Sequence, residues 1–223
     1  MSIWGRIFAL IYDPVMGRTE KAGLTAHRRT LLSEATGDVL EVGAGTGANL
    51  LLYGDGAQTL TLTEPEKPMV RRLEKHIAQR HPEAKLLRAP AEDLPFNDNS
   101  FDTVVSTLVL CTVDDQRRAL REMRRVLRPG GRLLFIEHVR SEEEKLARLQ
   151  DRMAPINVRI GHGCHSNRPT LDEIQNAGFT VTHVEHDTLK HAPRYIRPLI
   201  VGTAQPSQAS RQAPADKRAY SSA

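Results

Sequence analysis

The sequence is short of cysteine, aromatic residues and long apolar runs. Its 223 residues include two cysteines, Cys111 and Cys164, and no C-x-x-C pair. This count excludes a disulfide framework and makes a reducing, cytoplasmic location the expectation. The longest charge-free run in the core, from Thr103 to Val113, is too short to cross a bilayer, and the apolar run Ile7–Tyr12 lacks the small-residue cleavage site of a signal peptide. We therefore expect neither a membrane span nor a secretion signal.

Aromatic residues make up 4% of the chain, and the net charge is only +4. Six arginines gather in a helix expected from Asp114: Arg117, Arg118, Arg121, Arg124, Arg125 and Arg128. Surfaces that bind nucleic acid combine such cations with interleaved aromatic rings, which this stretch lacks. We interpret the arginines as a solvated face and expect no nucleic-acid partner. The mild positive charge permits an anionic ligand or membrane surface without requiring either.

What the sequence does contain is a ligand-binding turn at residues 38–50. Val39, Leu40 and Val42 have the apolar, β-branched character of a strand, and three alternate glycines follow: Gly43, Gly45 and Gly47. Glycines allow a sharp turn and leave no Cβ between the backbone and a ligand. The free N–H groups of the helix that follows point toward the same place.

Strands and helices alternate on both sides of this turn. Strands are expected at 39–42, 59–63, 84–88, 101–110, 132–137, 179–185 and 195–203, and helices at 19–35, 66–80, 114–127, 141–158 and from 170. Such alternation predicts an α/β fold: a Rossmann-like, seven-stranded, mostly parallel sheet with helices on both faces. Ligands in these folds bind at the carboxyl ends of the strands.

The chain divides into three parts. Residues 1–36 are expected to form N-terminal helices, residues 37–204 the main domain, and residues 205–223 a disordered tail rich in Gln, Ser, Pro and Ala. The first helix, at 2–16, is amphipathic. Packing on the domain is its favoured interpretation, with a lid over an apolar substrate or a contact with a membrane surface as alternatives.

Three ligands compete for the glycine turn. Gly43-x-Gly45-x-x-Ala48, with Glu64 further on, satisfies a dinucleotide pattern. A P-loop is excluded because no Gly-Lys-Ser/Thr follows. S-adenosylmethionine (SAM) carries a sulfonium and an ammonium group, so the acidic Glu41 before the first glycine suits it better than a pyrophosphate.

At this point the sequence resembles the class I SAM-dependent methyltransferases. Val39–Gly47 is similar to their first motif, and Ala91–Phe96 and Arg125–Gly131 are similar to later motifs in the same order. The resemblance implies a set of cofactor-binding residues: Glu41, Gly43, Ala44, Gly45, Thr46, Gly47, Glu64, Pro65, Ala91, Glu92, Thr107 and Leu108. Pro90 stands where quinone C-methyltransferases usually have Asp, so the implied adenine contacts pass to the Ala91 backbone and to Glu92.

A narrower resemblance concerns the acceptor side. Ser106–Thr112, Glu137–Val139 and Gly161–Cys164 are similar to segments of the animal thiol S-methyltransferases. The acceptor is expected to be small and apolar, and a thiol, a phenol or quinone, and a lipid amine are the candidates. Cys164 and His165 are candidate substrate contacts, and so is Tyr12 if the first helix forms a lid. Those relatives add an N-terminal anchoring segment, so peripheral membrane contact through residues 2–16 is a further expectation.

A thiol or phenol must lose a proton before it can accept a methyl group, which calls for a base. His138 and Glu137, at the end of an expected strand, are the candidates. The spacing of His162-Gly-Cys164-His165 fits no standard zinc site, so no metal is expected. No Asn/Asp-Pro-Pro-Tyr motif for methylation of base amines is present. A non-catalytic SAM-binding regulatory protein and an NAD-dependent oxidoreductase are the alternative functions.

Overall fold

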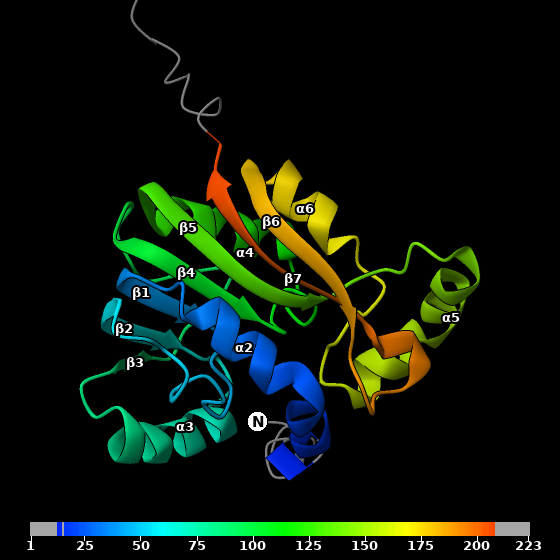
Figure 1. Ribbon diagram of the computed structural model, residues 1–223, viewed down its shortest axis with the longest axis horizontal. Coiled ribbons are helices and arrows are strands. Elements are labelled where there is room, and N and C mark those ends of the chain that lie inside the picture. The colour runs from blue at the N-terminus through cyan, green and yellow to red at the C-terminus, as the bar shows by residue number, and fades with distance from the viewer. Residues whose placement is uncertain (1–12, 15, 208–223) are drawn as a thin grey trace, which may run out of the picture.

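The computed structural model describes residues 13–14 and 16–207. Seven strands form one sheet in the order β3-β2-β1-β4-β5-β7-β6 (Figure 1). Their bounds are β1 Gly37–Val42, β2 Ala57–Thr63, β3 Lys85–Leu87, β4 Phe101–Thr107, β5 Leu127–His138, β6 Phe179–Thr188 and β7 Pro198–Pro206. The five strands β1 to β5 pair in parallel, whereas β7 runs antiparallel to both β5 and β6. The predicted α/β class and mostly parallel sheet are confirmed.

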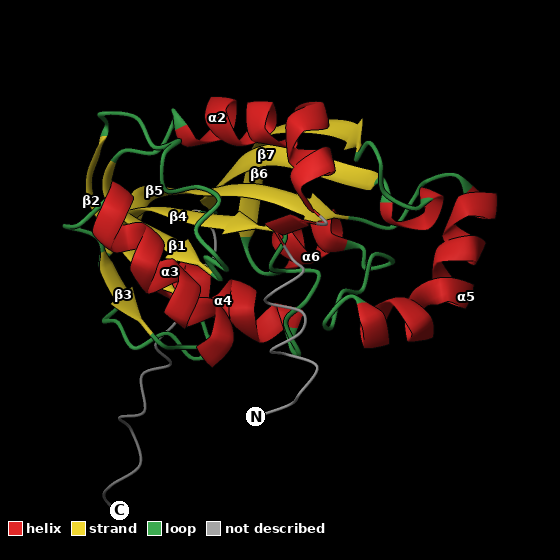
Figure 2. Ribbon diagram, turned by 90° about the horizontal axis from the view of Figure 1, so that it is seen from below, coloured by secondary structure: helices red, strands yellow, loops and turns green. Residues whose placement is uncertain are grey.

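Helices cover both faces of the sheet. Their bounds are α2 Thr25–Leu32, α3 Lys67–Arg80, α4 Gln116–Val126, α5 Glu144–Ile160 and α6 Thr170–Asn176, with a π-helical turn at Glu20–Leu24 and a 3-10 turn at Arg194–Ile196. Residues of α4 and α6 belong to one buried cluster and residues of α2 and α3 to another. Figure 2 shows α2 and α4 on opposite sides of the strands. Helix α5 projects beyond the end of the sheet (Figure 1).

The central strands show why the chain folds this way. Along β5, Leu133 and Phe135 pack into the α4–α6 cluster, whereas Leu134 and Ile136 pack into the α2–α3 cluster, and all four are fully buried. Successive side chains of a strand point to opposite faces, so an unbroken apolar run is needed where both faces are covered.

Several element boundaries differ from those expected. The strand expected over 101–110 ends at Thr107, because Leu108 adopts a left-handed φ of 62° and the following amides bond to a buried carboxylate. The helix expected over 19–35 is broken at Gly23, whose φ is 144°, into a π-helical turn and α2. Strand β7 continues through Gln205 and Pro206, two residues past the expected domain end.

Two expectations fall at the ends of the chain. The amphipathic helix at 2–16 and the tail beyond Ser207 lie almost wholly outside the described residues, so the three-part division stays a prediction. Within the described part of the chain, no helix combines the length and apolar character needed to cross a membrane.

Candidate functional site

The glycine turn lies at the carboxyl end of β1, with positive φ at Gly43 (64°) and Gly45 (57°). A Cβ added to Gly43 would come within 2.7 Å of a methyl group of Val109, so packing requires glycine there. At Gly45 an added Cβ would meet no atom within 4 Å. The backbone of Gly45 therefore borders open space, as a cradle for a closely held ligand would.

Glu64 links this turn to the end of β2. Its Oε2 accepts the N–H of Gly45 and its Oε1 accepts the N–H of Glu66, both at 2.9 Å. The side chain is buried, and desolvation raises its pKa above 4.5 while these backbone hydrogen bonds oppose the rise. An oxygen has more than one acceptor direction, so the carboxylate can hold the turn and still accept ligand hydroxyls. The neighbouring Pro65 accepts a bond from Arg88 Nε through its carbonyl at 2.8 Å.

A buried polar network lies beneath the turn. Glu41 accepts hydrogen bonds from Asn49 Nδ2 at 2.9 Å and from the Tyr53 hydroxyl at 2.6 Å. Arg28, only 3% exposed, donates from Nη1 to Asn49 Oδ1 at 2.9 Å and to the Thr107 hydroxyl at 2.8 Å. Burial raises the pKa of Glu41 from 4.5 to about 7, against the effect of the bonds from Tyr53 and Asn49. The network joins α2, β1 and β4 around one carboxylate.

The raised pKa of Glu41 predicts a pH-dependent stability. A carboxyl group whose folded pKa lies above its unfolded value contributes stability below about 4.5, and this is lost as pH rises through about 7. We expect the free energy of unfolding of the ligand-free protein to fall between about pH 5 and about pH 8, and Glu41→Gln to flatten that slope. Urea unfolding across this range measures it, with the exposed Glu142→Gln as the matched control. Equal slopes for wild type and Glu41→Gln would contradict the assignment.

The loop that carries Ala91 and Glu92 is fastened to α4. Glu92 Oε1 accepts the N–H groups of Asp114 at 2.8 Å and Asp115 at 3.3 Å. Ala91 is buried and contributes to the core beneath α4. The carboxylate of Glu92 thus positions the loop, and its predicted contact with adenine stays a prediction.

Glu137, a predicted base, is fully buried at the end of β5. Its Oε1 accepts the Ser106 hydroxyl at 2.8 Å and the N–H groups of Val109 and Leu110 at 3.0 Å, and Oε2 accepts the N–H of Cys111 at 3.3 Å. Burial raises its pKa to about 7, and these bonds oppose the rise. These four hydrogen bonds hold the turn at 108–111, which begins with a left-handed residue. Glu137 therefore has the geometry of a positioning residue.

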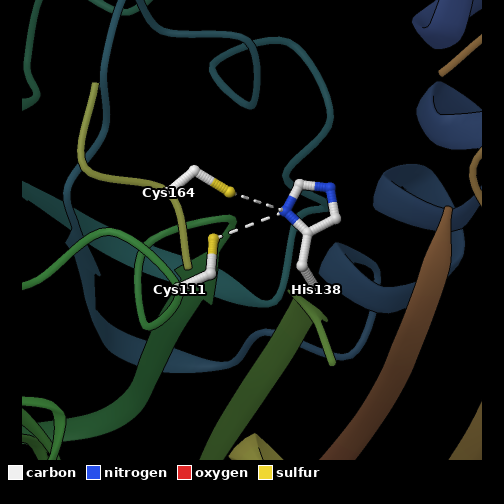
Figure 3. A group of neighbouring side chains, drawn as sticks. All are labelled: Cys111, His138 and Cys164. Atoms are coloured by element: carbon white, nitrogen blue, oxygen red, sulfur yellow. Dashed lines mark hydrogen bonds between the residues drawn. The ribbon is translucent and has the colours of Figure 1, made fainter. Parts of the chain in front are cut away.

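His138, the other predicted base, contacts both cysteines of the chain (Figure 3). Its Nδ1 lies 3.5 Å from Cys111 Sγ and 3.6 Å from Cys164 Sγ. Its Nε2 is buried and has no hydrogen-bond partner among the described residues. A hydrogen bond from Cys111 and the nearby His138 ring lower the pKa of the Cys164 thiol, although burial opposes this. The loop of Cys164 is tied to the end of β4 because the N–H of His165 donates to the Cys111 carbonyl at 2.7 Å.

The N-terminal segment reaches the glycine turn. Asp13 Oδ1 accepts the Thr46 hydroxyl at 2.6 Å, and its Oδ2 accepts Arg72 Nη2 from α3 at 2.6 Å. The start of the described chain therefore lies against the expected cofactor site, as a lid would. Tyr12, a predicted substrate contact, falls outside the described residues.

The chain is similar to known methyltransferases. A family model described as a methyltransferase domain matches residues 40–135. Thiol S-methyltransferase TMT1B of Homo sapiens is 40% identical over 181 residues, which are 78% of this chain and 73% of that protein. Thiol S-methyltransferase TMT1A of Homo sapiens is 33% identical over 201 residues, which are 88% and 82% of the two chains. This chain belongs to the class I SAM-dependent methyltransferases.

The solved structures agree with this methyltransferase at the level of the fold. The [4+2]-cyclase SpnF aligns with a TM-score of 0.68 over 91% of this chain and 94% of its own, at 20% identity. An identity that low shows the fold alone, and the cyclase activity in that protein's name differs from methyl transfer. The family membership, rather than the architecture, makes this chain an enzyme that uses SAM and decides among the three ligands considered for the turn.

The residues of the methyltransferase fit SAM at the carboxyl ends of β1, β2 and β4. The open backbone at Gly45 and the buried carboxylates of Glu41 and Glu64 suit a cationic, hydroxyl-bearing ligand. Thr107 ends β4 and Leu108 follows it. SAM supplies an electrophilic methyl group on its sulfonium. The part played by each predicted contact stays a prediction.

Arg28 and Tyr53 belong to this site but carry no motif, and sequence analysis misses both. One feature of the sequence could have identified Arg28. It lies four residues after Leu24 and four before Leu32, both buried, so it occupies the core face of its helix. An arginine on that face requires a buried partner. Of the segment His162–His165, only Cys164 belongs to the group of possible metal ligands among the described residues, and its neighbours there are Cys111 and His138.

Proposed function

We propose that this methyltransferase transfers the methyl group of SAM to the sulfur of a small, apolar thiol. Both human relatives carry the name thiol S-methyltransferase, which supports this acceptor. The proposal is carried by the surroundings of the His138 ring: its Nδ1 lies 3.5 Å from Cys111 Sγ and 3.6 Å from Cys164 Sγ, and its Nε2 is buried without a partner among the described residues. A buried polar atom without a protein partner calls for a water or a bound group, and an acceptor beside this ring would lie at the carboxyl ends of β4 and β5.

The chemistry requires the acceptor sulfur to be ionised and aligned. Methyl transfer is an in-line displacement, so the protein must hold the sulfur collinear with the methyl–sulfonium bond. A thiol loses its proton more easily than an alcohol of the same shape, and the thiolate is the nucleophile. The Cys111–His138–Cys164 group is where we expect the proton to leave. The turn at 108–111, fixed by Glu137, would shape the adjoining wall.

An assay with isotope-labelled SAM tests the acceptor. The full chain is incubated with small apolar thiols, with alcohols of the same carbon skeleton, with phenols, and with vesicles that contain phosphatidylethanolamine. We expect thioether products from the thiols and none from the matched alcohols. Methylation of phenols or lipid amines without methylation of thiols would contradict the proposal. Contact of residues 2–16 with a membrane stays a prediction, because those residues lie almost wholly outside the described chain.

A further inference from the structure

Three side chains that can bind a soft metal ion converge beyond the ends of β4 and β5 (Figure 3). Cys111 follows β4, His138 ends β5, and Cys164 lies in the loop between α5 and α6. Their ligand atoms all lie within 4.8 Å of one another, and all three residues are buried. Thiolate and imidazole groups are the ligands that Zn²⁺ prefers.

The distances match a zinc site. In a tetrahedral site with bonds of about 2.3 Å to sulfur and about 2.0–2.1 Å to nitrogen, sulfur and nitrogen ligands lie about 3.5–3.6 Å apart. The two distances here, from His138 Nδ1 to Cys111 Sγ and to Cys164 Sγ, are 3.5 Å and 3.6 Å. Nδ1 faces both sulfurs (Figure 3), and all three atoms lie within 4.8 Å of one another, so one ion between them would be within reach of all three.

The ligands are held in place by bonds outside the cluster. The Cys111 N–H donates to Glu137 Oε2 at 3.3 Å, and the Cys164 carbonyl accepts Asn157 Nδ2 at 2.7 Å. The hydrogen bond from the His165 N–H to the Cys111 carbonyl joins the two cysteine-bearing loops. These bonds fix the backbone of the two cysteines. A metal-bound histidine usually donates a hydrogen bond from its other ring nitrogen, and His138 Nε2 has no such partner among the described residues, so a water or the substrate would have to accept this bond.

We propose that Cys111, His138 and Cys164 bind one Zn²⁺ ion, whose fourth ligand is the sulfur of the acceptor. The described residues supply three ligands, and zinc sites with three protein ligands are typically catalytic, with water or substrate in the fourth position. The second half of this proposal rests on the proposed thiol acceptor. His138 then serves as a metal ligand through Nδ1 rather than as the base that removes the proton.

The chemistry balances without an oxidant or reductant. The acceptor sulfur donates a lone pair to Zn²⁺, and its S–H proton leaves to solvent because a coordinated thiol is deprotonated. The bound thiolate then attacks the SAM methyl group. A sulfur–carbon bond forms on the acceptor, and the methyl–sulfonium bond breaks with its electron pair going to the SAM sulfur, which leaves neutral S-adenosylhomocysteine. The thioether product is a weak ligand, so it can dissociate.

The metal content of the purified protein tests whether Cys111, His138 and Cys164 bind zinc. The full chain is purified from zinc-supplemented cells with a phosphine reductant, and zinc is counted by mass spectrometry. We expect about one zinc per chain, falling at least about tenfold in Cys111→Ser and in Cys164→Ser. His165→Asn, next to Cys164 but outside the cluster, is the matched control and is expected to retain the metal. Calorimetric titration with SAM shows whether each variant is folded.

Cobalt substitution tests both halves. The chain has no cysteine other than Cys111 and Cys164, so a sulfur-to-cobalt charge-transfer band in the thiol-free protein must come from them. We expect this band in the wild type and a stronger one after a thiol acceptor is added. The proposal would be overturned if the reduced protein contained no zinc and showed no cobalt band. This holds whether or not Cys111 and Cys164 form a disulfide before reduction. A band that thiols leave unchanged would overturn the role of the fourth ligand.

The two proposals can fail separately. Methylation of thiols by a protein that binds no metal would overturn the zinc site and leave the thiol acceptor standing. A protein that binds zinc through the cluster but methylates only phenols or lipid amines would overturn the thiol acceptor, and with it the acceptor as fourth ligand, while the metal site itself would stand.

Discussion

Replacing Glu137 by glutamine is expected to lower kcat/KM for methyl transfer by about 100-fold, the cost of misplacing a site by about 1 Å. The carboxylate accepts four hydrogen bonds, three of them from consecutive backbone amides of residues 109–111. Glutamine offers one carbonyl oxygen, and its NH₂ group would face a donor. We also expect the free energy of unfolding to fall by about 1–3 kcal/mol, because a buried donor is left without its acceptor.

The variants distinguish a positioning role of Glu137 from a direct action on the acceptor. Val109 packs against Gly43, so disorder of the turn at 108–111 should also raise KM for SAM. Ser106→Ala removes one donor from the same oxygen and is the milder control. Steady-state kinetics, SAM titration and urea unfolding are measured on each variant. A variant Glu137→Gln with normal stability and normal KM but a large loss of kcat would indicate that Glu137 acts directly on the acceptor.

The fold is largely predictable because its causes are local in the sequence. Apolar runs such as Leu133–Ile136 need cover on both faces, and the glycine turn needs backbone angles that other residues avoid. The end of β4 could not be predicted this way. Val109 and Leu110 continue the apolar pattern of the strand, but the carboxylate of Glu137, from the neighbouring strand, captures their amides and bends the chain. A contact across the sheet outweighed local preference.

The site itself was only half predictable. Residues that hold a cofactor through the backbone occur in one short motif, whereas Arg28 enters the same site from a helix that precedes it. Cys111, His138 and Cys164 come from three segments far apart in the sequence, and spacing cannot show that parallel strands and a return loop bring them together. His165 lies one residue from Cys164 and outside the cluster, so sequence proximity indicated the wrong partner.

Gly45→Ala is expected to weaken SAM binding by about 10- to 100-fold, since forcing an extra methyl group into a packed contact costs about 1–3 kcal/mol. A Cβ at this position meets no protein atom within 4 Å, so the methyl group would occupy the space beside the turn where we expect the cofactor. The substitution also places alanine at a φ of 57°, which costs about 1–2 kcal/mol of stability. These two effects must be separated.

Gly130→Ala separates them. Gly130 has a φ of 80°, is exposed, and likewise has no atom within 4 Å of an added Cβ, but it lies near the amino end of β5, away from the carboxyl ends of the strands. Both variants should therefore lose similar stability in urea, and only Gly45→Ala should lose affinity in calorimetric titration with SAM. SAM affinity equal to that of the wild type in both variants would mean that the open space at Gly45 is not where the cofactor approaches the backbone. An equal loss in both would make backbone strain, rather than contact with the cofactor, the cause.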